Sequence, residues 1–247
     1  TERMADSLRR LGIQVEEDSA ACRYVVHGQG GKIPATAADL YVGNAGTATR
    51  FLLPFLALGH GRYRVDGDPR MRERPIEPLL EALRALGVSA YSELGTGCPP
   101  VVVEAHGFPG GEVTLAGDQS SQYFSALLMT GPLTQQGLTL HVRHELVSRP
   151  YIDLTADVMQ SFGASMERSD DYRRLYVPGG QRYQARRYAI EPDASNAGYF
   201  FAAAALTGGK VRVLGLGSHS RQGDLALLDA LEQMGAHVTR SADFVEV

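Results

Sequence analysis

The sequence predicts an α/β protein built from repeated units of about 75 residues, and three observations support this fold class. First, four phrases each end an amphipathic helical pattern at a glycine and continue into a short strand pattern. The glycines of these phrases are separated by 75, 76 and 72 residues, which is more regular than unrelated helix ends would be. They are Gly12 in LRRLGIQVEE, Gly87 in LRALGVSAYS, Gly163 in MQSFGASMER and Gly235 in LEQMGAHVTR.

The other two observations lie upstream of the last three of these glycines. A strand pattern opens at an earlier glycine, each time 26 residues before the glycine that ends the helix. These strand-opening glycines are Gly61, Gly137 and Gly209. A small polar turn and an apolar helical run precede each strand, at residues 43–58, 117–133 and 192–206. Each unit is therefore predicted as turn, helix, strand, loop, helix and strand.

The elements follow this order along the chain. The sequence opens inside the second helix of a first unit, and that helix is expected to end at Gly12. The second and third units are complete. Their strands show alternating apolar residues, which predicts half-buried strands packed on helices. The residues that alternate are Val101 with Val103 and Leu138 with Leu140.

The fourth unit is expected to start at a Glu-Pro turn, and a crossing between domains is expected near Tyr188 to Pro192. We therefore predict one domain over residues 1–190, with three units of which the first is truncated. Residues 191–247 would form part of a second domain, and they are too few to bury a full core alone. This organisation is the one expected of an excerpt from a longer protein.

Composition excludes several classes of protein. The longest apolar stretches, such as residues 51–58, are far shorter than the roughly 20 residues that a membrane-spanning helix needs. Cys22 and Cys98 make neither a disulfide framework nor a metal site, which is typical of reduced thiols. A net charge of -4 argues against general binding of polyanions. We expect a soluble, cytoplasmic, globular protein in which any anion site is local.

Two turns before apolar helices are candidate anion sites, because helix N-termini carry free N–H groups and a partial positive charge. In GNAGTATR, Gly46 and Thr47 can offer N–H and hydroxyl donors, and Arg50 adds charge one turn later. At the equivalent place in the next unit, GDQSSQ presents two hydroxyls and an amide, from Ser120, Ser121 and Gln122. Either turn alone could be an ordinary helix cap, and their equivalent positions favour a shared site.

Two further segments carry candidate ligands. DPRMRERP places Arg70, Arg72 and Arg74 at alternate positions, so in an extended chain they share one face. A guanidinium can bind phosphate or carboxylate with two hydrogen bonds, although pairing with neighbouring glutamates is the simpler explanation for a single arginine. In the next unit the corresponding loop, ELVSRPYIDL, offers the hydroxyls of Ser148 and Tyr151.

Other signals are weaker. His141 and His144 lie on a predicted strand without a motif for metal binding, so no metal is expected. Residues 172–188 alternate arginines with tyrosines, which would suit single-stranded nucleic acid. A hairpin whose arginines cover tyrosine rings explains that pattern equally well. Neither a GxxxxGK[ST] nor a GxGxxG motif occurs in a suitable place, so no nucleotide cofactor is predicted.

Four long motifs together resemble the 5-enolpyruvylshikimate-3-phosphate (EPSP) synthase family, also called 3-phosphoshikimate 1-carboxyvinyltransferases. They are LYVGNAGTATRFL, DGDPRMRERPI, SSQYFSALLMTGPL and LVSRPYIDLT, in the order of the family. The resemblance implies two domains of three α/β units each, with helices inside and sheets outside. It also implies transfer of the enolpyruvyl group of phosphoenolpyruvate to the 5-hydroxyl of shikimate 3-phosphate, with release of phosphate. Residues 1–190 would then be the domain that binds shikimate 3-phosphate.

The resemblance also implies roles for single residues. The predicted ligands of shikimate 3-phosphate are Thr47, Ser120, Ser121, Gln122, Ser148 and Tyr151. Phosphoenolpyruvate would border Gly46, Arg70 and Gln122. Asn44 and Arg50 would support the glycine turn, and Asp193 and Ser195 would lie at the hinge between the domains. No cofactor, metal, nucleic acid or membrane partner is implied, and a monomer is expected.

The family's early Lys-Ser-Arg segment and its catalytic carboxylates have no counterpart in these residues, so we expect this chain alone not to turn over. Phe51 stands where many members have proline, so sensitivity to glyphosate, which competes near this loop, is not predicted. Two alternatives remain open. One is the related enolpyruvyl transferase that acts on UDP-N-acetylglucosamine, and the other is a non-catalytic module that binds anions or RNA, for example through Arg186 and Arg187.

Overall fold

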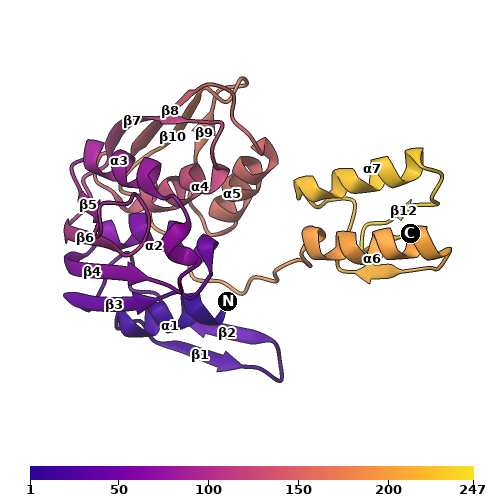
Figure 1. The fold of residues 1–247 in the computed structure, drawn as a ribbon, viewed down its shortest axis with the longest axis horizontal. Coiled ribbons are helices and arrows are strands. Elements are labelled where there is room, and N and C mark those ends of the chain that lie inside the picture. Colours follow the sequence, from indigo (N-terminus) through magenta and orange to yellow (C-terminus); the bar gives the residue numbers. More distant parts are fainter. The chain divides into compact units, whose positions relative to one another are not determined.

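A computed structural model describes all residues from 1 to 247, and they divide into two compact units (Figure 1). Unit 1 comprises Thr1–Ala185 and unit 2 comprises Arg186–Val247. The division falls in the stretch without regular structure that precedes helix α6 (Ala194–Thr207), a few residues before the predicted boundary at 190. The assignment of a separate binding domain to residues 1–190 stays a prediction. None of the helices is long and apolar enough to cross a lipid bilayer.

The predicted repeat is present in the order of the elements. Each unit of the repeat runs helix, strand, helix and antiparallel strand pair. In unit 1 these are α1 (Glu2–Arg10), β1 (Val15–Asp18), β2 (Arg23–Val26), β3 (Ala37–Tyr41), α2 (Gly46–Ala57), β4 (His60–Asp66), α3 (Glu77–Ala85), β5 (Ser89–Ser92), β6 (Val101–His106), β7 (Gly111–Ala116), α4 (Ser121–Thr130), β8 (Leu138–Arg143), α5 (Arg149–Ser161), β9 (Glu167–Arg168) and β10 (Arg174–Val177). In unit 2 they are α6 (Ala194–Thr207), β11 (Arg212–Leu214), α7 (Ala226–Gln233), β12 (Thr239–Arg240) and β13 (Phe244–Glu246).

Sheet topology repeats as well. The two four-stranded sheets have the orders β3-β4-β6-β5 and β7-β8-β10-β9, each with one parallel pair followed by two antiparallel pairs. The sheet β11-β13-β12 of unit 2 has the same order without the strand equivalent to β3 or β7. The repeat pattern predicted two strands per unit, whereas each four-stranded sheet holds four, because a hairpin follows each second helix and one more strand precedes each first helix.

The helix-ending glycines explain how each unit turns from helix to hairpin. Gly12, Gly87, Gly163 and Gly235 have φ values of +84°, +84°, +82° and +97°. Only glycine adopts this left-handed conformation without strain, and it ends a helix by closing its last turn. The four positions predicted from the spacing therefore play one conformational role.

Helices α2 and α4 form the interior of unit 1. They pack against each other, α2 against β4 and β6, and α4 against β8 (Figure 1). Eight residues of α2 and eight of α4 are buried, so both helices are apolar nearly all round. The sheets lie outside these helices, which is the inside-out arrangement that the resemblance implied.

One expectation about the strands was wrong. Val101, Val102 and Val103 of β6 are all buried, so this strand is covered on both faces rather than half-buried. Val102 is flanked by Arg64 on β4 and Tyr91 on β5, whose long side chains lie on the outer face of the sheet. The start of β8 is buried in the same way.

Unit 2 has a separate small core around Phe201, Leu216 and Leu228. On α6 this core takes up only one face, since Tyr199, Phe200 and Leu206 are 77%, 61% and 85% exposed. The apolar run at residues 192–206 therefore forms the predicted helix, but three of its four large apolar side chains are uncovered.

Candidate functional site

The N-terminal ends of three helices gather in unit 1. Gln122, in the first turn of α4, donates from Nε2 to Thr47 Oγ1 of α2 at 3.4 Å and accepts from Arg50 Nη1 at 3.1 Å. Ser125 of α4 and Thr155 of α5 share a buried hydrogen bond of 2.8 Å. These bonds join the early turns of α2, α4 and α5, so the three helices begin at the same end of the bundle.

This end of the bundle favours an anion. The first turns of α2, α4 and α5 contain no acidic residue that would offset the partial positive charge of the helix ends. A cavity of about 390 Å³ opens beside them. It is lined by Arg50, Pro75, Pro78, Gln119, Ser120, Gln122 and Tyr123. The two turns predicted to share a site are thus brought together by the fold.

Arg50 is the cation of this cavity. Its guanidinium lies 5.7 Å from the ring centre of Tyr123, whose hydroxyl donates to the Pro75 carbonyl at 3.1 Å. Arg50 Nε is buried and lacks a hydrogen-bond partner. A buried donor without an acceptor is costly, so this group would gain from an anionic ligand. The predicted role of Arg50, support of the glycine turn, stays a prediction, and the contact seen here is with α4 instead.

The glycine turn connects β3 to α2. Val42 N–H donates to the Asp66 carbonyl at 2.8 Å, and Gly46 N–H donates to the Asn44 carbonyl at 3.0 Å. A Cβ atom on Gly46 would lie 2.5 Å from Arg74 Nη1, so the arginine fits against this turn only because the residue is glycine. Arg74 also makes long contacts, of 3.4 and 3.5 Å, to the two oxygens of Asn44.

The three arginines of the DPRMRERP loop therefore have different surroundings. Arg74 lies against the glycine turn. Arg72 donates from Nε and Nη2 to the two carboxylate oxygens of Asp66, at 2.9 and 2.7 Å. Arg70 is 73% exposed and pairs with Glu73 at 2.6 Å. The expectation that they share one face of an extended chain was wrong, because a 3-10 turn at Met71–Glu73 rotates them apart.

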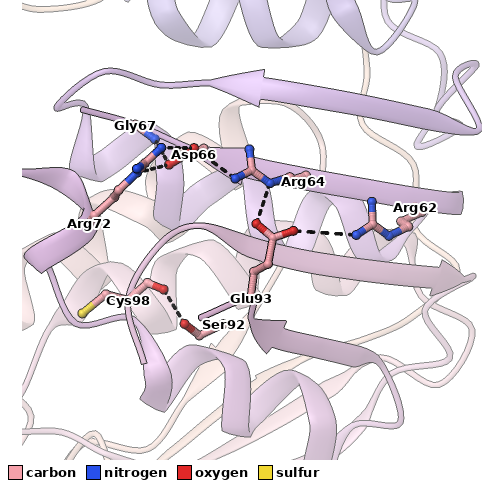
Figure 2. Close-up of polar contacts among 8 residues, drawn as sticks. All are labelled: Arg62, Arg64, Asp66, Gly67, Arg72, Ser92, Glu93 and Cys98. Carbon is pink, nitrogen blue, oxygen red and sulfur yellow. Dashed lines mark hydrogen bonds and ion pairs between the residues drawn. The ribbon is translucent and has the colours of Figure 1, made fainter. Parts of the chain in front are cut away.

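Figure 2 shows the ion pairs on the outer face of the β4 sheet. Asp66 lies between Arg72 and Arg64, and Glu93 lies between Arg64 and Arg62. Burial by itself would raise the pKa of Asp66. The hydrogen bonds from Arg72 and from Gly67 N–H outweigh that effect and hold the pKa below its usual value. Asp66 is accordingly ionised.

The hydroxyls predicted on α4 differ in their tasks. Ser120 is the N-cap of α4 and accepts from Gln122 N–H at 3.3 Å, and it also lines the cavity. Ser121 is buried in the first turn, 8% exposed. The capping alternative thus describes Ser120, and capping leaves its hydroxyl proton available for donation.

Ser148 and Tyr151 lie at the start of α5. Ser148 is the residue before the helix, with φ 55° and ψ 43°, and it is exposed. Tyr151 N–H donates to the Ser148 carbonyl at 3.0 Å, and the Tyr151 ring is 36% exposed. A left-handed serine is uncommon and is typical of functional loops. Neither residue lines the cavity beside α4, and their roles as ligands stay predictions.

The remaining predicted residues lie in unit 2. Asp193 is the N-cap of α6 and accepts from Asn196 N–H at 3.1 Å, and Ser195 is in the first turn. Their role at a hinge stays a prediction. Gln222, which the sequence did not single out, fixes this turn by donating to the Pro192 carbonyl and accepting from Ala194 N–H, both at 2.8 Å.

Three arginines of the third unit lie over tyrosine rings, and one of them, Arg174, belongs to the segment 172–188. Arg168 and Arg149 lie 4.2 and 5.3 Å from the ring centre of Tyr172, and Arg174 lies 5.1 Å from that of Tyr176. The Tyr172 hydroxyl donates to Asp153 at 2.6 Å. This arrangement supports the hairpin explanation for these residues, and RNA binding through Arg186 and Arg187 stays untested.

Asp66 is the main residue of this region that sequence analysis missed. A strand that ends in an acidic residue, followed six positions later by an arginine, was the available signal.

Known proteins resemble this chain in both sequence and fold. The model of the family EPSP synthase (3-phosphoshikimate 1-carboxyvinyltransferase) matches residues 1–247. A 3-phosphoshikimate 1-carboxyvinyltransferase of Nostoc is 47% identical over 247 residues, which are 100% of this chain and 58% of the relative. The chloroplastic protein of that name from Petunia hybrida is 46% identical, over 99% of this chain and 49% of the relative.

Among solved structures, the EPSP synthase of Acinetobacter baumannii aligns with a TM-score of 0.77 and 23% identity, over 98% of this chain and 54% of that one. This likeness concerns the fold. The chain spans about half the length of the curated relatives that it matches.

Proposed function

The chain belongs to the EPSP synthase family, and from this we propose that it carries the shikimate 3-phosphate side of a 3-phosphoshikimate 1-carboxyvinyltransferase site. In the proposed reaction the 5-hydroxyl oxygen of shikimate 3-phosphate attacks C2 of phosphoenolpyruvate, whose C3 takes up a proton. The tetrahedral adduct then loses a proton and inorganic phosphate, which leaves the 1-carboxyvinyl ether. Of the two alternatives left open by the sequence, the family match disfavours the transferase that acts on UDP-N-acetylglucosamine.

The observation that carries the proposal is the bridge made by Gln122. It joins Thr47 and Arg50 on one repeat to the Ser120 turn on the next, at the positive ends of both helices. A ligand with a phosphate and several hydroxyls requires cationic and neutral donors close together, and this junction supplies both. We assign the phosphate to the hydroxyls of the Ser120 and Ser121 turn and of Ser148.

Phosphoenolpyruvate is proposed to bind across the glycine turn. Gly46 has no side chain, so the Arg74 guanidinium lies against the N-terminus of α2 and adds positive charge where the anion is proposed to bind. We assign Arg70 to neutralise the phosphate of phosphoenolpyruvate. Arg70 would then give up its exposed ion pair with Glu73, which contributes little stability in water. Gln122 lies between the two assigned positions and would contact both substrates. We propose that the protein is located in the cytoplasm.

Calorimetric titration of this chain with shikimate 3-phosphate tests the proposal, since binding does not require turnover. We expect binding that is lost in Ser121→Ala and retained in Arg70→Ala, because Arg70 is assigned to the other substrate. Ser89→Ala, on β5, is a matched control that should bind like the unaltered chain. UDP-N-acetylglucosamine should give no heat.

The proposal fails if the folded chain binds no shikimate 3-phosphate at millimolar concentration. It also fails if the UDP-sugar binds more tightly, or if Ser121→Ala and Ser89→Ala behave alike.

A further inference from the structure

Asp66 is the only buried side chain that carries a charge in this structure, with 8% of its surface exposed. Burying a carboxylate is costly unless every oxygen is compensated. Both oxygens have two partners. Oδ1 accepts from Arg72 Nε and Gly67 N–H, at 2.9 and 2.8 Å. Oδ2 contacts Arg72 Nη2 at 2.7 Å and Arg64 Nη2 at 3.2 Å.

The segment between Asp66 and Arg72 is fixed at several points. Asp68 Oδ1 accepts from Met71 N–H at 3.0 Å, and Asp68 N–H donates to the Gly43 carbonyl at 3.2 Å. Met71 is buried against α2, where Thr49 Oγ1 donates to its sulfur at 3.6 Å. The loop is therefore tied to the end of β4 on one side and to the glycine turn and α2 on the other.

The pairing with Asp66 also distinguishes Arg72 from Arg70 and Arg74. Arg72 uses two donors on a carboxylate that is already ionised, so it is not available to an external anion. Arg70, two positions before Arg72, has only the exposed partner Glu73. Arg74, two positions after Arg72, makes only long contacts with Asn44. Without the carboxylate, Arg72 would lose both of its acceptors, and the loop would lose its two-bond attachment to the end of β4.

We propose that Asp66 is a positioning residue. By holding Arg72 with both carboxylate oxygens, it fixes loop 67–74 so that Arg70 is presented to the phosphate of phosphoenolpyruvate beside the glycine turn. This inference rests on the proposed function for its ligand, whereas the fixing of the loop rests on the contacts alone. Asp66 lies on the outer side of the sheet and touches no substrate in this assignment.

The test uses the whole chain and two readouts. The first is hydrogen exchange of the backbone amides in residues 67–74, with α4 as internal reference. In Asp66→Asn we expect exchange in the loop to rise about tenfold or more, with α4 unchanged. Arg72→Lys keeps the charge but loses the two parallel hydrogen bonds of the guanidinium. Its exchange rate in the loop should therefore lie between those of the unaltered chain and Asp66→Asn. Asp18→Asn breaks an exposed Arg–Asp pair, to Arg23 at 3.0 Å, and is the matched control.

The second readout is calorimetric affinity for phosphoenolpyruvate at saturating shikimate 3-phosphate. In Asp66→Asn we expect affinity for phosphoenolpyruvate to fall about tenfold, while affinity for shikimate 3-phosphate is retained. A general structural role would weaken both equally and would speed exchange in α4 too, and either result would overturn the inference. Unchanged exchange in the loop of Asp66→Asn would also overturn it.

The two proposals fail differently. If the unaltered chain binds neither substrate, the proposed function fails, and the exchange measurement still decides whether Asp66 fixes the loop. If both substrates bind but Asp66→Asn changes neither readout, only the positioning role is lost.

Discussion

Gln122 uses both ends of one amide group to connect two repeats, with its nitrogen on Thr47 and its oxygen on Arg50. A single residue thereby defines how the early turns of α2 and α4 meet. The motif SSQ predicted a binding role for Gln122, and the glycine turn predicted one for Gly46 and Thr47; these roles stay predictions. The sequence could not predict the hydrogen bond between Gln122 and Thr47, because these residues are 75 positions apart and the bond depends on how the helices pack.

Gln122→Glu tests this bridge. A carboxylate cannot donate to Thr47, but it can pair with Arg50, so we expect the free energy of unfolding to change by less than about 1 kcal/mol. Affinity for shikimate 3-phosphate should fall by about tenfold or more, since the new charge repels the anion and occupies Arg50. Thermal unfolding and calorimetry measure the two effects. Gln181→Glu, far along the chain, is the control, and an unaltered affinity in Gln122→Glu would contradict the bridge.

Asp66 gives a second prediction at this scale, concerning pH. Its folded-state pKa lies below the ordinary value of 3.8, so the unfolded chain binds the proton more readily. The stability that the carboxylate supplies is complete above about pH 4 and is lost as pH falls through the folded-state pKa. Asp66→Asn lacks this contribution, which we estimate at about 1–3 kcal/mol at neutral pH.

Denaturant unfolding of both proteins between neutral and acidic pH provides the measurement. The difference between them should be constant down to about pH 4 and then shrink. A difference that grows toward acid would show the opposite sign of the pKa shift.

At the scale of elements, the recurring glycines were the most informative part of the sequence. Their spacing located the ends of all four second helices, and the positive φ values show why glycine stands there. Strand order could not be predicted, because period-2 patterns report which face is buried and not which neighbour a strand has. The double burial of β6 was missed for a related reason. Arg64 and Tyr91 flank Val102 on the neighbouring strands, and long side chains of this kind can shield apolar surface without registering as apolar in a sequence pattern.

The strand-opening glycines allow a matched comparison. A Cβ atom on Gly61 would lie 2.0 Å from the Thr36 carbonyl oxygen, which is backbone that holds β3 beside β4. A Cβ atom on Gly209, the equivalent position in unit 2, would meet only Thr207 Oγ1, at 3.1 Å. We expect Gly61→Ala to cost about 1–3 kcal/mol or more and Gly209→Ala to stay within about 0.5 kcal/mol. Denaturant unfolding measures both, and equal losses would contradict the steric explanation.

At the scale of the whole molecule, the two compact units have separate cores. All the residues assigned to shikimate 3-phosphate, from Thr47 to Tyr151, lie in unit 1. The compact units meet at residues 185 and 186, and the domain boundary that the sequence indicates at 190, from the Glu-Pro turn and the change of repeat, stays a prediction. The sequence did not indicate that α6 leaves Tyr199, Phe200 and Leu206 uncovered, since an apolar run does not reveal what packs on it.

Truncation tests the independence of unit 1. A chain of residues 1–185 should unfold cooperatively and should bind shikimate 3-phosphate with the affinity of the whole chain. Circular dichroism and calorimetry measure the two properties. Loss of binding in a truncated chain that still unfolds cooperatively would show that residues beyond 185 contribute to this site.

The equivalence of the α2 and α4 turns has a consequence for how such a site can change over evolutionary time. Two equivalent segments of the repeat meet at one place with different chemistry, since the first offers the Gly46 backbone and the Thr47 hydroxyl and the second offers two serine hydroxyls. Selection on either turn can therefore alter recognition of one partner molecule and leave the scaffold, and the other half of the recognition, intact.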